Sequence, residues 1–239
     1  FSDSAISHTG IIDGASWAGP TWTTGKFDGA LDFDGVDDYV GVPDLISLEP
    51  IHVTVEAWIN RLGAPGYNKY IVGKHYGPSW NSYALRAFSS GLQFYIGTTS
   101  TWYASPMSGP VWDGSWHYVV GTFDGSYVRL YVDGSEVGTG KPVPVGTSIA
   151  YDGAGVTIGV PGDPWLGGPY HFGGKIDEVR ISGIARTPGE ITANWNTGAG
   201  LELLADGDTV ALWHFDESVG TTAYDSSGND NDGTIHGAK

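Results

Sequence analysis

Apolar and polar residues alternate in several short runs along the chain. Residues 53–59 read Val-Thr-Val-Glu-Ala-Trp-Ile, with apolar side chains at positions 53, 55, 57 and 59. A period of two is typical of a β-strand that buries one face. Comparable runs occur at residues 83–87, 92–96, 118–123, 127–132, 156–160, 175–182 and 210–215. The pattern predicts an all-β protein.

The turns between these runs indicate antiparallel neighbours. Asp124-Gly125 and Asp133-Gly134 each follow a predicted strand, and Phe88-Ser-Ser-Gly91 separates two more. Asp-Gly pairs supply the positive φ angles that two-residue hairpin turns require. Regularly spaced short strands favour an antiparallel β-sandwich or a barrel.

One short helix is predicted near residues 187–195. Thr187-Pro-Gly-Glu190 places Thr at the N-cap, Pro at the first helical position and Glu three residues after the Thr. This arrangement is a capping box. We expect the helix to close one end of the sandwich.

Composition excludes several classes of protein. The chain has 27 Asp and Glu against 11 Lys and Arg, which gives a formal net charge of −16. Because an acidic protein is repelled by the phosphate groups of DNA and RNA, binding to nucleic acid is not expected. It contains no cysteine, so thiolate metal sites and Cys nucleophiles are excluded. No apolar run approaches the roughly 18 residues of a membrane helix, so no transmembrane segment is expected.

The two ends of the chain resemble each other. Residues 1–15 align without a gap with residues 224–238, an offset of 223 residues, and share Ser4/Ser227, Gly10/Gly233, Ile12/Ile235, Gly14/Gly237 and Ala15/Ala238. This spacing is that of a whole domain. The sequence predicts a domain over residues 1–197 that lacks its own first strand, a connector over 198–209, and a segment over 210–239 equivalent to the opening strands of a next repeat. A segment cut from a tandem array and a chance match are the alternatives.

The segment over 210–239 is interpreted as a donor of the missing strand. A domain without its first strand exposes a sheet edge that another strand can fill. The segment could fill that edge in its own domain or in a neighbouring chain, and the second arrangement is head-to-tail and can continue as a filament. The expected donor side chains are Val210, Leu212, Trp213, Phe215 and Ile235.

Five motifs, in order, resemble the concanavalin A-like, laminin-G-like jelly-roll family. They lie at residues 30–40, 53–59, 116–124, 130–134 and 174–181. Three further motifs, at 213–217, 225–228 and 233–237, resemble the amino-terminal opening of that family. The resemblance covers nearly the whole chain and implies an antiparallel β-sandwich of laminin-G-like type. It does not fix function, because this fold serves carbohydrate-binding modules, adhesins and enzyme-appended domains.

Catalysis is not expected. Glucanases of a related jelly-roll fold carry two Glu and an Asp at alternating positions of one strand, with acid and nucleophile about 5 Å apart. Glu56 stands alone on its predicted strand, and the adjacent Asp177 and Glu178 would face opposite sides. The sequence has no Gly-x-Ser-x-Gly motif and its seven His are scattered, so no nucleophilic triad is indicated.

Structural calcium is one interpretation of the acidic stretch at residues 225–233. Asp225, Asn229 and Asn231 offer the oxygen ligands that hard cations take. The family resemblance implies a calcium between the opening segment and the strand that carries Asp177 and Glu178. The alternative is a solvated turn whose Asp and Asn side chains cap the backbone.

Large rings in predicted loops are candidates for ligand contact. Exposed aromatic rings stack on the C–H faces of sugars, but Tyr and Trp are also enriched at subunit interfaces. The sequence leaves both alternatives open for Trp80, Trp102, Tyr103, Trp165, Tyr170 and His171.

The leading hypothesis from the sequence is a non-catalytic, extracellular structural or adhesive module at the cell surface. Copies of the chain would join head-to-tail by β-strand complementation, as repeats of a filament or tandem array. The alternative is a carbohydrate-binding module of a secreted polysaccharide-active enzyme, with glycans as partners.

Overall fold

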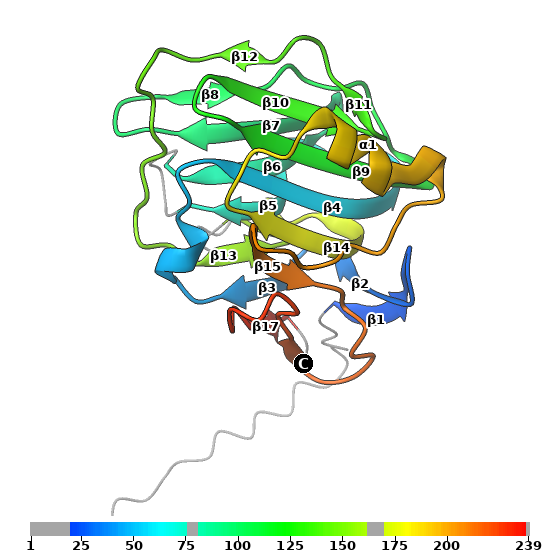
Figure 1. Cartoon of the computed structure of the whole chain (residues 1–239). Helices are drawn as coiled ribbons and strands as arrows, with labels where there is room; N and C mark the ends of the chain where they lie inside the picture. Colours follow the sequence, from blue (N-terminus) through cyan, green and yellow to red (C-terminus); the bar gives the residue numbers. More distant parts are fainter. Residues whose placement is uncertain (1–19, 76–80, 162–169, 238–239) are drawn as a thin grey trace, which may run out of the picture.

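Two antiparallel sheets pack face to face in the computed structural model, which describes residues 20–75, 81–161 and 170–237 (Figure 1). Sheet A has the spatial order β1 (Thr21–Thr24), β2 (Gly29–Asp34), β14 (Gly173–Ser182), β4 (Val53–Leu62), β9 (Asp113–Phe123), β10 (Tyr127–Val132) and β11 (Ser135–Glu136), with β12 (Lys141–Pro142) paired to β10 and β15 (Thr209–Trp213) paired to β14. Sheet B has the order β16 (Thr222–Ala223), β17 (Gly233–His236), β3 (Tyr39–Val42), β13 (Val156–Ile158), β5 (Lys69–Lys74), β6 (Tyr83–Phe88), β7 (Gly91–Gly97) and β8 (Trp102–Ala104). Two 3-10 turns, η1 (Ile46–Leu48) and η3 (Asn196–Gly198), lie in the connections. The predicted antiparallel jelly-roll sandwich is confirmed.

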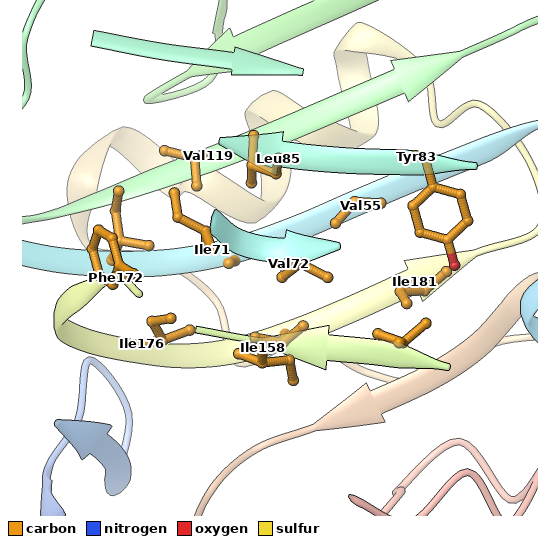
Figure 2. Packing of buried hydrophobic residues seen from close by; sticks show 14 of the residues in the cluster. Val55, Ile71, Val72, Tyr83, Leu85, Val119, Ile158, Phe172, Ile176 and Ile181 are labelled. Atoms are coloured by element: carbon orange, nitrogen blue, oxygen red, sulfur yellow. The ribbon is translucent and has the colours of Figure 1, made fainter. Parts of the chain in front are cut away.

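The core lies between the two sheets, where the alternating pattern placed it. Figure 2 shows Ile71, Val72 and Leu85 of sheet B packed with Val55 and Val119 of sheet A. All five side chains are fully buried. A β-bulge in β5 between Tyr70 and Val72 lets both Ile71 and Val72 enter this core.

The predicted helix is confirmed as α1 (Pro188–Trp195), with Thr187 at the N-cap and a complete capping box with Glu190. Its expected place at an end of the sandwich is wrong. The helix lies across the outer face of sheet A (Figure 1), where Ile191 joins a cluster with Trp58, Tyr118, Val120 and Tyr131. These side chains point away from the main core. The helix α1 packs over them and shields them from solvent.

The carboxyl-terminal segment belongs to the sandwich of its own chain. β15 pairs with the second half of β14, from Val179 to Ser182, while β2 pairs with the first half of the same edge. β17 pairs with β3 in sheet B. Residues 199–208, within the predicted connector, contain no strand. The segment thus fills the sheet edges of its own chain in this structure, and exchange with a neighbouring chain stays a hypothesis.

Candidate functional site

An open groove lies on the outer face of sheet B and is lined by residues of β6, β7, β8 and the adjoining loops. These three strands are labelled in Figure 1. Its volume is about 520 Å³, within the range of about 300–1,000 Å³ typical of small-molecule sites. The described residues that line it are Gly66, Tyr67, Arg86, Phe88, Ser89, Ser90, Gln93, Trp102 and Met107. Among these nine residues there is no carboxylate.

Strand register builds the floor of the groove. Arg86 of β6 lies opposite Tyr70 of β5 on one side and opposite Gln93 of β7 on the other. One guanidinium nitrogen of Arg86 donates to Gln93 Oε1 at 2.9 Å, and the other terminal nitrogen donates to Asn68 Oδ1 at 3.3 Å. Neighbouring residues of β6 face the core, so alternation alone turns Arg86 outward.

Aromatic rings surround this guanidinium group. The Arg86 guanidinium carbon lies 4.4 Å from the ring centroid of Tyr95, 5.3 Å from that of Phe88 and 5.7 Å from that of Trp102. Tyr95 and Trp102 meet edge to face at 6.3 Å, and Tyr67 and Phe88 do so at 5.6 Å. These contacts hold the rings in fixed orientations along the groove.

Two rings of the groove are strongly exposed to solvent. Tyr67 is 78% exposed and Trp102 is 43% exposed, whereas Tyr95 beneath them is fully buried. A flat, solvent-facing ring on a rigid support can stack on the apolar face of a sugar without a large entropic cost.

The β6–β7 hairpin fixes one wall of the groove. The predicted turn at Phe88–Gly91 is confirmed, with Phe88 opposite Gly91 in the register. Gly91 has φ +139°, and a Cβ at this position would lie 2.2 Å from the carbonyl oxygen of Ser108. Glycine is therefore required here for the Ser108 segment to pack against the hairpin.

The predicted aromatic residues lie in different environments in the structure. Trp102 lines the groove, but its neighbour Tyr103 packs against the main core, because successive residues of a strand face opposite sides. Tyr170 packs against the cluster that contains Tyr70 and Tyr95. The backbone of His171 pairs with that of Tyr70 in an isolated parallel β-bridge. Trp80 and Trp165 lie outside the described residues.

The sequence reasoning missed Tyr67, Arg86 and Phe88. The alternation within residues 83–88 could have revealed Arg86 and Phe88, because they share a face opposite to Tyr83, Leu85 and Ala87. Tyr67 carries no such signal, since it lies in the connection before β5.

The predicted donor residues occupy the interior of their own domain. Trp213 and Phe215 are fully buried, Leu212 is 1% exposed and Ile235 is 5% exposed. Trp213 Nε1 donates to the backbone oxygen of Asn231 at 3.0 Å. Val210 is partly buried at the margin of the core.

The predicted calcium ligands are engaged in hydrogen bonds within the chain. Asp225 Oδ1 accepts from the backbone amides of Leu212 and Ser227, and its Oδ2 accepts from Asn231 N. The side-chain amide nitrogens of Asn229 and Asn231 donate to the carbonyl oxygen of Val210. These contacts match the capping alternative.

The two acidic residues of β14 are occupied elsewhere. Asp177 Oδ2 accepts from the backbone amides of Lys26 and Phe27, while Glu178 accepts from Leu203 N and contacts His214 Nδ1 at 2.6 Å. Burial raises the pKa of Asp177 to about 8. Within residues 20–75, 81–161 and 170–237, the group of three acidic or His side chains close enough to share one ion does not include Asp177, Glu178 or Asp225. The five-residue calcium site stays a prediction.

A bulge explains why Asp177 and Glu178 do not simply alternate. Glu178 has φ +51°, and the register with β4 shifts between Asp177 and Arg180. Both carboxyl side chains are consequently buried, whereas a regular strand would place them on opposite faces.

Glu56 forms buried ion pairs. It is fully buried, and its Oε2 lies 2.6 Å from Arg180 Nε and 3.6 Å from Arg186 Nε. The hydroxyl group of Tyr118 donates to its other oxygen. All of these groups lie between sheet A and the segments that cover it, away from the groove on sheet B.

A family model described as the concanavalin A-like lectin/glucanases superfamily matches residues 34–192. The chain belongs to this superfamily. No curated protein matches the chain. Within the described part of the chain, no helix is long and apolar enough to cross a membrane.

Solved structures share the fold at low sequence identity. A protein from Bacteroides ovatus, provisionally described as carbohydrate-binding, is 22% identical with a TM-score of 0.67, over 88% of this chain and 58% of that chain. Domain 4 of AbnA, an extracellular arabinanase from Geobacillus stearothermophilus solved with arabinotriose, is 20% identical with a TM-score of 0.53, over 72% and 79%. The heptameric SAP-like pentraxin from Limulus polyphemus is 17% identical with a TM-score of 0.56, over 81% and 94%. At these identities the likeness shows the fold, and this chain spans little more than half of the Bacteroides protein.

Proposed function

We propose that this chain is a non-catalytic, extracellular carbohydrate-binding module whose glycan lies in the groove on the outer face of sheet B. The observation that carries the proposal is the pair of solvent-facing rings in the groove, Trp102 beside the buried Arg86 and Tyr67 in edge-to-face contact with Phe88. Carbohydrate-binding relatives of the same fold support it.

The chemistry of the groove suits a sugar. The rings of Tyr67 and Trp102 offer apolar faces for C–H stacking, and Ser89, Ser90 and Gln93 offer hydroxyl and amide groups for hydrogen bonds. Trp102 and Gln93 lie on strands of sheet B, and Ser89 and Ser90 lie in the tight turn between two of its strands, so these groups lose little order when a ligand binds.

The positions of the carboxylates support a binding role rather than hydrolysis. A glycosidase requires two carboxyl groups facing the bound sugar. The described lining of the groove offers none, and Glu56 is buried in ion pairs beneath the cover of sheet A.

The proposal is tested by screening the purified chain on an array of neutral and acidic oligosaccharides, followed by calorimetry with the best ligand. Trp102→Ala should weaken binding by about tenfold or more, as expected for an exposed aromatic anchor. Tyr67→Ala should also weaken it. Tyr224→Ala is the matched control, because this ring is 58% exposed on the carboxyl-terminal segment and is not part of the groove. Binding that Trp102→Ala leaves unchanged would place the glycan elsewhere.

Head-to-tail assembly by strand exchange is the second candidate, and the match of residues 1–15 to residues 224–238 favours it. The exchanged element would be the segment that contains β15 and β17, which here pair with β14 and β3 of the same chain. Sedimentation velocity over a hundredfold range of concentration tests it. A growing series of oligomers would support exchange, and a single monomeric species would reject it.

A further inference from the structure

Three carboxylates meet where β2 ends and β3 begins. Asp34 is the last residue of β2, and Asp37 and Asp38 directly precede Tyr39 at the start of β3. One carboxylate oxygen from each Asp lies within 4.8 Å of the other two. No other group of three or more acidic or His side chains converges in this way within the described residues.

Asp38 is the member that demands an explanation. It is 1% exposed, and its Oδ1 has no hydrogen-bond partner. A buried carboxylate oxygen without a hydrogen-bond donor destabilises the folded state, because it has given up its hydrogen bonds to water and has formed none in the protein. Its other oxygen, Oδ2, accepts from the backbone amide of Asp34 at 2.7 Å.

Positive charge from the protein does not neutralise the cluster. None of the described Lys, Arg or His side chains forms an ion pair with Asp34, Asp37 or Asp38. The cluster therefore brings three carboxyl groups together without a counter-charge from the described side chains, and one of the three, Asp38, is buried.

The carboxyl-terminal strand approaches the same point. His236 pairs with Tyr39, and the two rings stack at 4.5 Å. At the next residue, Gly237, a Cβ would lie 2.5 Å from Asp38 Oδ1. Any residue other than glycine at position 237 would place its Cβ too close to Asp38 Oδ1. Glycine therefore leaves this side of the oxygen free of side-chain atoms.

We propose that Asp34, Asp37 and Asp38 form a calcium site in the β2–β3 turn, beside the end of the carboxyl-terminal strand. Carboxylate oxygens are the ligands of hard cations, and calcium binds them at 2.3–2.6 Å, so ligands on opposite sides of the ion lie up to about 5 Å apart. The spacing of the three oxygens fits this limit. Magnesium requires shorter bonds and a stricter octahedron, which three side chains from one short turn suit less well. Water molecules complete the coordination.

This site is tested by calorimetry and thermal unfolding of the whole chain after treatment with a chelator. Calcium chloride and magnesium chloride are the probes. Wild type should bind one calcium ion, bind magnesium at least tenfold more weakly, and melt at a higher temperature in calcium. Asp37→Asn should weaken calcium binding at least tenfold and reduce the thermal shift. This variant should fold normally, because the Asp37 side chain is half-buried and makes no hydrogen bond within the described chain. Asp38→Asn should abolish the effect, and if it fails to fold, Asp37→Asn alone decides.

Asp208→Asn is the matched control, since it removes the same charge from an exposed residue before β15. It should bind calcium as wild type does. No calcium binding by wild type, or equal binding by wild type and Asp37→Asn, would overturn the proposal. Calcium binding that is lost in Glu178→Gln or Asp225→Asn, but not in Asp37→Asn, would overturn it as well and assign the ion to the site predicted from the sequence.

Discussion

Arg86 and Tyr95 form a stacked pair on sheet B, with the guanidinium carbon 4.4 Å from the ring centroid. They lie on adjacent strands, β6 and β7, neither of which contains an acidic residue. A planar guanidinium group can stack on a ring and donate within its plane at the same time, which an ammonium group cannot. Arg86 thereby couples the polar floor of the groove to the rings above it.

Replacement of Arg86 by Lys should therefore lower both glycan affinity and stability, although the charge is kept. We expect a loss of about 1–3 kcal/mol in the free energy of unfolding, since contacts to Gln93, Asn68 and the rings are removed together. Urea unfolding and calorimetry with the glycan measure the two effects. Arg129→Lys is the matched control, because Arg129 stacks on Tyr127 at 4.3 Å on sheet A. It should leave glycan affinity unchanged, and an equal loss of affinity in both variants would contradict the role assigned to Arg86.

Trp213→Ala should destabilise the whole domain rather than release one segment. Trp213 is fully buried in the main core and bonded to the Asn231 backbone. Large-to-small changes of buried Trp cost about 3–5 kcal/mol. Chemical denaturation followed by fluorescence and by circular dichroism should show one shared transition at lower denaturant. Leu204→Ala, at a residue 71% exposed, should change the midpoint little. Two separate transitions would indicate that the carboxyl-terminal segment folds independently.

Glu56→Gln should be strongly destabilising because it leaves Arg180 buried without its counter-charge. The Glu56–Arg180 distance is 2.6 Å and both side chains are almost fully buried. Removal of one partner of such a pair costs about 3–5 kcal/mol. Glu190→Gln, which affects a partly exposed partner of Arg186 at 3.4 Å, should cost less than about 1 kcal/mol. Thermal unfolding of the two variants compares them directly, and similar losses would contradict a dominant buried pair.

Asp177 should make the domain less stable as the pH rises. Burial raises the pKa of this carboxyl group from 3.8 to about 8, so the folded state holds a proton that the unfolded chain releases. Its contribution to stability is complete below about pH 4 and is lost as the pH rises through 8, by at most about 1.4 kcal/mol per pH unit.

The measurement is urea unfolding of wild type and Asp177→Asn between pH 5 and pH 9. Asparagine keeps an oxygen to accept from the amides of Lys26 and Phe27 but does not titrate. The wild-type curve should fall relative to that of the variant across this range, and Asp208→Asn should follow wild type. Parallel curves for wild type and Asp177→Asn would show that the carboxyl group is already ionised in the folded protein.

Local sequence determined much of this protein. The alternation at residues 53–59 and 83–87 predicted the strands and the face of each that enters the main core, because a pleated strand turns successive side chains to opposite sides. The expectation that residues 53–59 bury one face only is wrong, because the covering segments bury the other face of β4 as well. Thr187 and Glu190 predicted the start of α1, because a capping box is completed within four residues. The turn at Phe88–Gly91 was likewise predicted from local sequence, because Ser-Ser-Gly separates two alternating runs. The close approach of Ser108, which also requires glycine at position 91, is a tertiary contact.

Only the tertiary structure decided how these elements work together. Trp102 and Tyr103 were equivalent as sequence, yet one lines the groove and the other enters the core, because the pairing of β8 with β7 fixes which face is inside. The row of Tyr70, Arg86 and Gln93 depends on the register of three strands and on the bulge in β5. The bulge at Glu178 buried two adjacent carboxylates that alternation would have separated. Periodicity specifies which residues share a face, whereas long-range strand pairing and the covering segments decide what that face meets.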